Sequence, residues 1–297
     1  MAGNTRVKKK ISLEPMLWSS LMYLLGLVFL FYYLYPRVKA YIESNQIAVP
    51  EVSLGPILAY FFGVVVVLGV VLFFIPVSKL KFVLRVLFAI LYGWGMVIIL
   101  GLALPAEAAI GLGAAVALWW LFLPLVWLQN ILLLVTLVAV GAVFGTLVPP
   151  WTVVWILLAV SVYDIVAVVL GYMMWLAKKL SESDTLPAFI LPKKARDWTL
   201  NLRGSSVRKL FEEESAERDF SLLGGGDIGF PLVFVASVFS AYGFSTALVV
   251  AGASLAGLIF AYLLQIFLLK GKPLPALPPI CFLAVIGFLG VYFTSLH

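Results

Sequence analysis

The chain has 297 residues, 64% of them hydrophobic, with 20 Lys or Arg, 14 Asp or Glu and a formal net charge of +6. A typical soluble domain is only about 45–50% apolar and about a quarter charged, and a soluble fold of this size has too little interior for so much apolar surface. The composition therefore excludes a soluble enzyme, a nucleic-acid-binding module and a secreted disulfide scaffold. It predicts an all-α polytopic membrane protein, because helices satisfy their own backbone hydrogen bonds in lipid.

Apolar runs bounded by charged residues, proline or glycine predict nine transmembrane helices. In chain order these are Leu17–Tyr35, Leu54–Pro76, Val83–Pro105, Ala108–Pro124, Asn130–Val148, Trp151–Ala177, Leu222–Tyr242, Ser245–Leu269 and Ala276–Leu296. Some of these helices are separated by only a few residues, so the number of helices could differ from nine by one or two. We expect one integral membrane domain, in which residues 1–177 form the first six helices, residues 178–221 a polar cytoplasmic loop and residues 222–297 the last three helices.

The distribution of positive charge predicts the orientation of these helices. With the N-terminus inside, all but two of the 20 Lys and Arg residues fall in inside segments, and only Arg37 and Lys39 fall outside. This asymmetry follows the preference of membrane proteins for positive charge on the cytoplasmic side. We therefore expect a cytoplasmic N-terminus and an outside C-terminus, and we attribute the net charge to topology rather than to a nucleic-acid partner.

The loop between the sixth and seventh helices is the only long polar segment. It contains the acidic run Phe211-Glu212-Glu213-Glu214 and an apolar island from Pro187 to Pro192. This composition is typical of a solvated, partly disordered loop. The alternative is that the loop gates a site formed by the helices that it joins.

Two acidic residues, Asp164 and Asp227, lie inside expected helices, whereas the others lie at helix ends or in loops. A charged side chain in hydrocarbon costs at least about 2.5–3.5 kcal/mol, so it is rarely left there without a partner or a cavity. No Lys or Arg lies deep in any expected helix. We therefore expect each aspartate to be the partner of the other.

Two carboxyl groups in one site away from water share a single proton, because like charges at close range repel strongly. The ionised group of such a pair removes a proton from water, while the protonated group polarises a peptide carbonyl. This chemistry needs no metal or cofactor, and one cysteine, Cys281, and one histidine, His297, are too few for a zinc site. From the aspartates alone, a protease, an ion-coupled transporter and a structural pair all remain open.

Both aspartates, and the start of the last helix, have distinctive neighbours. Tyr163 precedes Asp164, the triplet Gly224-Gly225-Gly226 precedes Asp227, and Pro275-Ala276-Leu277-Pro278 opens the last helix. Irregular backbone of the kind that glycine and proline produce is tolerated in a membrane only where it lines a cavity or is buried in protein. We reject a dinucleotide site at the Gly-x-Gly-x-x-Gly letters, because that motif belongs in a βαβ unit.

Together, Tyr-Asp in the sixth helix, Gly-x-Gly-Asp in the seventh and Pro-Ala-Leu in the ninth resemble the presenilin and signal-peptide-peptidase family of intramembrane aspartyl proteases. The resemblance covers the whole nine-helix plan and looks most like an archaeal or other microbial homologue in a cell membrane. It implies cleavage of peptide bonds within transmembrane segments of membrane proteins or signal peptides. It also implies that no metal, cofactor or obligatory partner subunit is needed, and it leaves a homo-oligomer open.

The resemblance further implies a role for each motif residue. Gly225 stands where many relatives carry leucine, which should loosen the local backbone. By this resemblance the catalytic residues are Asp164 and Asp227, the residues that shape the active site are Tyr163, Gly224 and Gly226, and the residues that support it and bind the substrate backbone are Pro275, Ala276 and Leu277.

The alternative function is a proton- or cation-coupled transporter, in which the same aspartates relay protons at a helix broken around the glycine triplet. An inverted repeat would require a matching broken helix elsewhere in the chain, and none is apparent. Small residues at four-residue spacing, Ala253, Gly257 and Ala261, predict close helix packing.

Other polar residues in the apolar runs have a structural interpretation. Gln129, Asn130 and Gln265 predict hydrogen bonds between helices rather than catalysis.

The depths of the two aspartates differ if the helices are straight. Asp164 lies 14 residues before Lys178, about 20 Å by helix rise, whereas Asp227 lies six residues, about 9 Å, after Ser221. We therefore predict that the sixth helix extends beyond the membrane or bends near Gly171, with the interface near residue 175 and both aspartates in the cytoplasmic half.

Overall fold

The structure is a computed structural model that describes residues 13–47, 54–74, 77–172, 175, 186–203, 220–268 and 274–294. Some of the charged residues behind the predicted orientation and the polar loop lie outside the described residues: the inside basic residues Arg6, Lys8, Lys9, Lys10, Lys270 and Lys272, and the loop's Glu212, Glu213 and Glu214.

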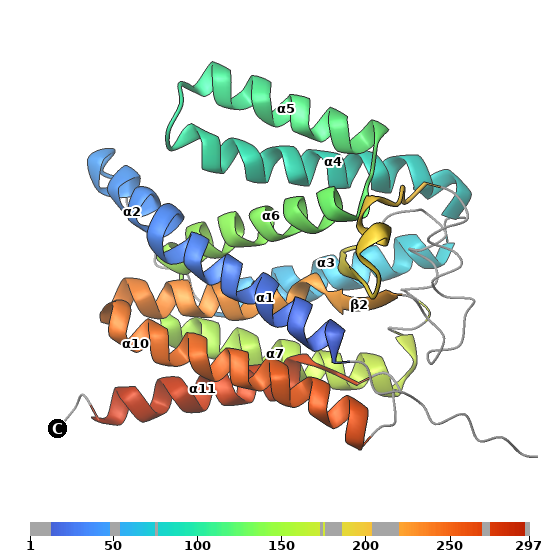
Figure 1. The fold of residues 1–297 in the computed structure, drawn as a ribbon. Helices are drawn as coiled ribbons and strands as arrows, with labels where there is room; N and C mark the ends of the chain where they lie inside the picture. The colour runs from blue at the N-terminus through green and yellow to red at the C-terminus, as the bar shows by residue number, and fades with distance from the viewer. Residues whose placement is uncertain are drawn as a thin grey trace, which may run out of the picture.

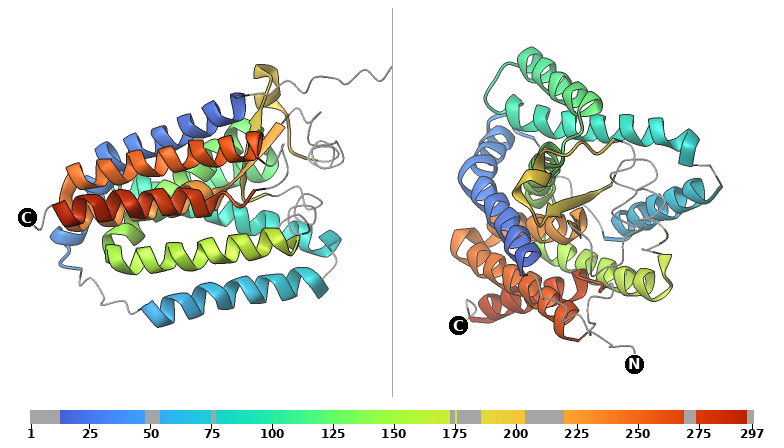
Figure 2. Two further views of the ribbon diagram at one scale, coloured as in Figure 1. Left: turned by 90° about the horizontal axis from the view of Figure 1, so that it is seen from below. Right: turned by 45° about the vertical axis from the view of Figure 1, so that its right-hand side comes forward.

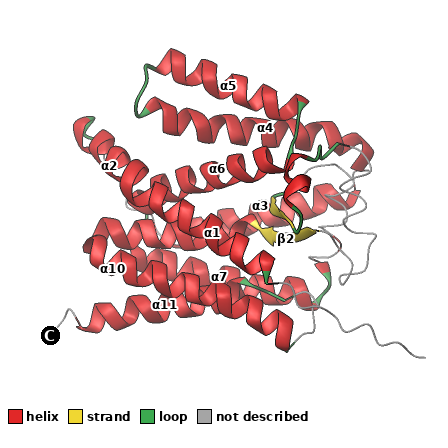
Figure 3. Cartoon of the chain, in the orientation of Figure 1, coloured by secondary structure: helices red, strands yellow, loops and turns green. Residues whose placement is uncertain are grey.

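The described chain is a bundle of helices with two short strands at one end (Figures 1 and 3). Within the described ranges, six helical stretches are long and apolar enough to cross a membrane by length and composition, and two shorter apolar helices accompany them. This confirms the helical membrane class predicted from composition. The helices are α1 (Glu14–Phe29), η1 (Leu30–Leu34), α2 (Tyr35–Ser44), α3 (Leu54–Phe74), α4 (Val77–Gly101), α5 (Ala106–Phe122), α6 (Val126–Leu147), α7 (Pro150–Val169), η2 (Ala195–Thr199), α10 (Gly225–Phe267) and α11 (Leu277–Thr294).

The first helix is longer than predicted. α1, η1 and α2 form one helical stretch, Glu14–Ser44, of 31 residues, whereas the sequence predicted an end at Tyr35. η1 is a π-helical turn in which the Tyr35 N–H bonds to the Leu30 carbonyl, five residues back. Pro36 lies directly after this wider turn, which changes the local hydrogen-bond pattern where proline cannot donate, and the helix continues through it.

α10 contains a break at Gly243, whose φ of 82° and ψ of −178° suit only glycine. The helix axis reverses there, as the two orange rods in Figure 1 show. The two halves correspond to the predicted helices Leu222–Tyr242 and Ser245–Leu269. The exception is residues 222–224, which belong to a strand rather than to the helix.

α7 ends at Val169, earlier than the predicted end at Ala177, which lies outside the described residues. Gly171 follows with a φ of 72°, so the chain bends where the sequence predicted a bend. Trp175 stacks on Tyr172, with ring centroids 5.5 Å apart.

Counted from the nearest helix end, the two aspartates lie at similar positions. Asp164 lies five residues before Val169, about 8 Å by helix rise. Asp227 is the third residue of α10. Both carboxyl groups therefore lie close to helix ends.

The polar loop is partly folded, which corrects the expectation of a solvated segment for residues 186–203 and 220–221. The apolar island supplies strand β1 (Ala188–Pro192), which pairs antiparallel with β2 (Phe220–Gly224). In β1, Phe189, Ile190 and Leu191 are at most 1% exposed, because the strand packs against α1 and α6. Residues 178–185 and 204–219 of the loop lie outside the described residues.

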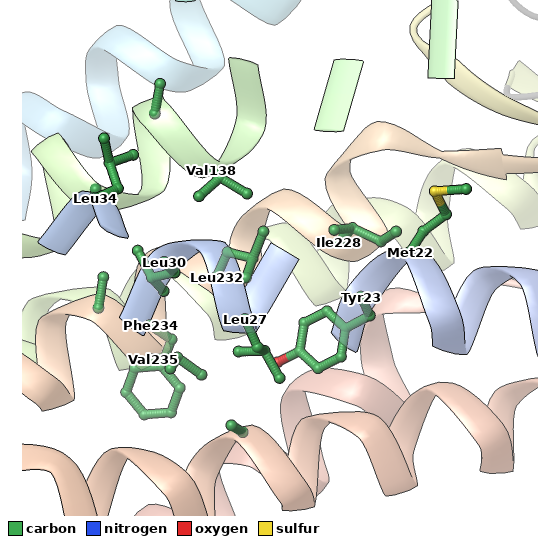
Figure 4. Packing of buried hydrophobic residues seen from close by; sticks show 14 of the residues in the cluster. Met22, Tyr23, Leu27, Leu30, Leu34, Val138, Ile228, Leu232, Phe234 and Val235 are labelled. Atoms are coloured by element: carbon green, nitrogen blue, oxygen red, sulfur yellow. The ribbon is translucent and has the colours of Figure 1, made fainter. Parts of the chain in front are cut away.

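α10 lies at the centre of the bundle, in contact with α1, α6, α7 and α11. Figure 4 shows part of this core, with Tyr23 and Leu27 of α1 beside Ile228 and Leu232 of α10. Figure 2 shows the same bundle from below and from one side, with α3 at its edge. The core thus holds the beginning of α10, which carries Asp227, in a fixed position among the other helices.

Small residues bring the helices into close contact, as their spacing predicted. A Cβ added at Gly257 would lie 2.6 Å from Ile280 Cα, so α10 and α11 touch through their backbones. This close approach fixes the beginning of α11 relative to α10.

Candidate active site

A hydrogen bond joins Asp164 to the start of α11. The Asp164 side chain is buried in the bundle, and its Oδ2 accepts a hydrogen bond from the backbone N–H of Leu277 at 3.2 Å. The two residues are 113 positions apart in the chain. The fold therefore brings the Tyr-Asp motif and the Pro-Ala-Leu motif together.

The position of Leu277 at the start of α11 explains why its N–H bonds to a carboxyl group. The first N–H groups of a helix have no partner within the helix. At the start of α11, Pro278 and Pro279 have no N–H, and the next N–H bonds back to the Ala276 carbonyl at 3.5 Å. The Leu277 N–H is left for Asp164, and the positive end of the helix dipole stabilises negative charge at this position.

Asp227 lies in the first turn of α10, and its carboxyl group turns back towards the end of β2. The Gly224 N–H donates a hydrogen bond to this carboxyl group. A Cβ added at Gly224 would lie 3.2 Å from Asp227 Oδ2. Glycine at this position therefore lets the backbone approach the carboxyl group closely.

The two aspartates are close enough for their charges to interact. Each lies at a helix N-terminus, Asp227 in its own helix and Asp164 at the start of α11. Three further described side chains lie close enough for an electrostatic interaction with this pair: Cys281 with both aspartates, Tyr262 with Asp227 and Tyr163 with Asp164. The site is therefore built from α7, α10 and α11, the three helices that carry the sequence motifs.

Gly225 joins the start of α10 to the loop. Its N–H bonds to the Pro187 carbonyl at 2.9 Å, and a Cβ at this position would lie 3.1 Å from the same oxygen. The missing side chain thus allows two backbone segments to approach closely. The expectation that Gly225 loosens the local backbone was wrong.

The other predicted residues surround these groups. Tyr163 directs its ring towards Phe62 of α3, with centroids 6.5 Å apart. Gly226 faces the ring of Phe230, 3.3 Å from where a Cβ would lie. Pro275 and Ala276 lie in the irregular segment that leads into α11. The structure therefore groups Asp164, Asp227, Gly224 and Leu277, and it places Tyr163 beside Asp164 with its ring edge-on against Phe62 of α3.

Of two polar residues that the sequence assigned to hydrogen bonds between helices, Gln129 confirms the prediction by accepting the Trp120 indole N–H of α5, whereas Asn130 bonds to the strand β1. Asn130 bonds to the backbone of Ile190, and Gln129 bonds to the Leu186 carbonyl. The available signal was the apolar island in the loop, because a buried strand needs polar partners along its outer edge.

A comparison with protein families decides which family the chain represents. A family model described as "Signal-peptide peptidase, presenilin aspartyl protease" matches residues 47–295. The chain belongs to this family. It is therefore a multi-pass membrane protein and an intramembrane aspartyl protease, as the resemblance of its motifs predicted.

Two solved structures, both described as a presenilin family intramembrane aspartate protease, are similar to this protease. The first, in a C222 crystal form, is 21% identical, has a TM-score of 0.59 and covers 93% of this chain and 98% of its own. The second, in a P2 crystal form, is 22% identical, has a TM-score of 0.55 and covers 94% and 98%. At these identities the likeness shows a presenilin-like fold. A search of curated proteins finds no match.

Proposed function

We propose that Asp164 and Asp227 are the catalytic pair of this intramembrane aspartyl protease. The observation that carries the proposal is the hydrogen bond from the Leu277 N–H to Asp164, beside a second carboxyl group whose charge interacts with it. An aspartate pair that shares one proton provides both a base and an acid in one site.

In the proposed reaction, the ionised carboxylate takes a proton from water as the water oxygen attacks the substrate carbonyl carbon. The protonated carboxyl group gives its proton to the carbonyl oxygen, which forms a tetrahedral intermediate. The C–N bond then breaks, and the leaving nitrogen takes a proton from the pair. The Leu277 N–H keeps Asp164 oriented, and we assign Tyr163, Gly224 and Gly226 to the shape of the site.

The proposed substrates are transmembrane segments of membrane proteins or signal peptides. A substrate helix must unwind locally before water attacks, because its carbonyls are bonded within the helix. An unwound segment needs new backbone partners. A strand edge beside the catalytic pair that no other described strand occupies supplies them, since strand addition satisfies the exposed backbone of an extended peptide.

The β2 edge is suited to this role. In an antiparallel pair, the direction of the backbone groups alternates along each strand. Because the Gly225 N–H bonds to the Pro187 carbonyl of the β1 side, the backbone groups of Phe220 and Leu222 point away from β1, whereas the Gly224 N–H is already bonded to Asp227. A substrate strand bound there leads directly to Asp227, and we assign Pro275, Ala276 and Leu277 to the support of its other side.

We also propose nine membrane spans, with the N-terminus in the cytoplasm and the C-terminus outside. Counting the two halves of α10 separately supports nine, and the charge distribution of the sequence supports the orientation. Water then reaches the pair from the cytoplasmic side. The proposed location is the cell membrane of a microbe, where the chain works without an obligatory partner subunit, alone or as a homo-oligomer.

The test uses the purified protein in liposomes with a single-pass transmembrane substrate. Wild type, Asp164→Asn, Asp227→Asn and a control, Glu107→Gln at the start of α5, are compared by mass spectrometry of the fragments. We expect cuts within the apolar segment by wild type and the control, and none by either asparagine variant. Cleavage that persists in Asp164→Asn or Asp227→Asn would contradict the proposed pair.

A further inference from the structure

We propose that Asn130 is a positioning residue of this protease, which holds β1 and, through the two-stranded sheet, the start of α10 with Asp227. The inference rests on the proposed function, because it concerns the same catalytic pair. It adds a residue of α6 that lies outside the three motifs.

The side-chain amide of Asn130 replaces a neighbouring strand. Its Nδ2 donates to the Ile190 carbonyl at 2.7 Å, and its Oδ1 accepts the Ile190 N–H at 2.9 Å. Both residues are at most 1% exposed. One planar amide thus satisfies both backbone groups of one strand residue, in the manner of a paired residue in an antiparallel sheet.

Gln129 fixes the beginning of the same segment. Its Nε2 donates to the Leu186 carbonyl at 2.9 Å, and its Oε1 accepts the indole N–H of Trp120 at 2.8 Å. Trp120 in turn packs edge-on against the Tyr92 ring, with centroids 5.0 Å apart. The outer edge of β1 is therefore bound to a buried framework of α4, α5 and α6.

The sheet carries this anchoring to the catalytic pair in two steps. Ile190 lies opposite Leu222 in the strand register, so a fixed β1 fixes β2. β2 ends at Gly224, whose N–H contacts the Asp227 carboxyl group, and the Pro187 carbonyl bonds to the Gly225 N–H. If β1 moved away from α6, its bonds would draw the start of α10 with it.

The same contacts decide which edge of the sheet is available. Asn130 occupies the backbone groups of Ile190, Gln129 occupies the Leu186 carbonyl, and Pro192 has no N–H to offer. The outer edge of β1 is thus closed to an added strand at these positions. An extended substrate is directed to β2, the edge next to Asp227.

The experiment compares Asn130→Leu and Asn130→Gln with wild type, with Thr136→Val as the control. Leucine has nearly the same size but no hydrogen-bonding groups, and glutamine restores both of them. Thr136 lies on the same helix, and its buried hydroxyl faces Gly95 of α4 rather than the sheet. The readouts are kcat and KM per folded molecule, the positions of the cuts, and amide hydrogen exchange of residues 188–192.

We expect Asn130→Leu to lower kcat by about tenfold to a hundredfold, as for a small misplacement of a catalytic group, with little change in KM. Its cuts should spread over neighbouring bonds, and exchange in β1 should accelerate. Asn130→Gln should recover part of kcat, and Thr136→Val should match wild type. A variant with reduced thermal stability but unchanged kcat and cut positions would reduce Asn130 to a structural residue and overturn the proposal.

Two outcomes distinguish a failure of this proposal from a failure of the proposed catalytic pair. If wild type cleaves no substrate, the proposed function fails, and hydrogen exchange still decides whether Asn130 holds β1. Unchanged exchange in Asn130→Leu would overturn the proposal. If Asn130→Leu does not fold, Asn130→Ser provides the same comparison, because one short hydroxyl cannot reach both Ile190 groups.

Discussion

Asp164 is held by a backbone donor rather than by a side chain. The Leu277 N–H lies 3.2 Å from its Oδ2, and the prolines at the next two positions have no N–H of their own. Most side-chain substitutions at Leu277 would therefore leave this hydrogen bond in place. Only proline removes the donor, which makes one substitution a specific test of the bond.

We predict that Leu277→Pro lowers kcat by about tenfold to a hundredfold, because a hydrogen bond to a charged group is worth roughly 1.5–3 kcal/mol. Proline suits the first position of a helix, so α11 should still form. Cleavage rates measured in liposomes, with circular dichroism to establish folding, provide the test.

The control is Leu277→Ala, which removes the apolar side chain and keeps the N–H. It should lose stability but keep most of kcat. Equal loss of kcat in both variants would show that the side chain, not the hydrogen bond, matters.

At the scale of the helices, Gly257 allows α10 to approach the beginning of α11 closely. A Cβ at Gly257 would lie 2.6 Å from Ile280 Cα and 2.9 Å from the Pro279 carbonyl, and neither backbone atom can turn aside. α11 begins a few residues earlier, at Leu277, so its displacement would also move the donor to Asp164.

Gly257→Ala should therefore lower the free energy of unfolding by about 1–3 kcal/mol, as overpacking does, and reduce kcat. Gly252→Ala in the same helix is the matched control, because a Cβ there meets nothing within 4 Å. Alanine in an open helical position should stabilise by about 0.5–1 kcal/mol. Thermal unfolding in detergent measures both, and a shift of the same sign in the two variants would contradict the packing argument.

The elements could be predicted from the sequence where one signal dominates. Long apolar runs predicted the helices, and the neighbours of Asp164, Asp227 and Leu277 indicated that these residues share a site. The continuation through Pro36 could not be predicted, because it depends on a π-helical turn that leaves no pattern of its own.

β1 and its anchor could not be predicted for a different reason. An apolar island of a few residues in a polar loop does not distinguish a strand from a turn. Asn130 has a partner 60 residues away, and nothing near it in the sequence indicates a strand. This part of the site depends on the contact between the loop and α6, which the sequence does not indicate.

For the molecule as a whole, the proposed orientation separates the exposed loops onto two sides of the membrane. Lys39 on α2 should face outside, and Lys194, between β1 and η2, should face the cytoplasm. Cys281 is the only cysteine and is buried, so an added cysteine gives an unambiguous signal.

In intact cells, we predict that a membrane-impermeant maleimide labels Lys39→Cys and spares Lys194→Cys until the membrane is permeabilised. Wild type, which has only Cys281, is the control and should stay unlabelled. The reverse pattern would invert the orientation, and labelling of both from outside would contradict the nine-span count.

The position of Asp164 within α7 also determines the expected lengths of the two cleavage products. It lies 14 residues after Pro150 and five before Val169, about 21 Å and about 8 Å by helix rise. A substrate helix aligned with α7 should therefore be cut near one end, leaving a long fragment in the bilayer and a short stub on the other side. The apolar length of a peptide determines how firmly it is retained in lipid. We therefore expect the short product to leave into water and the long product to stay in the membrane. Mass spectrometry of the aqueous and lipid phases will show where each product is found.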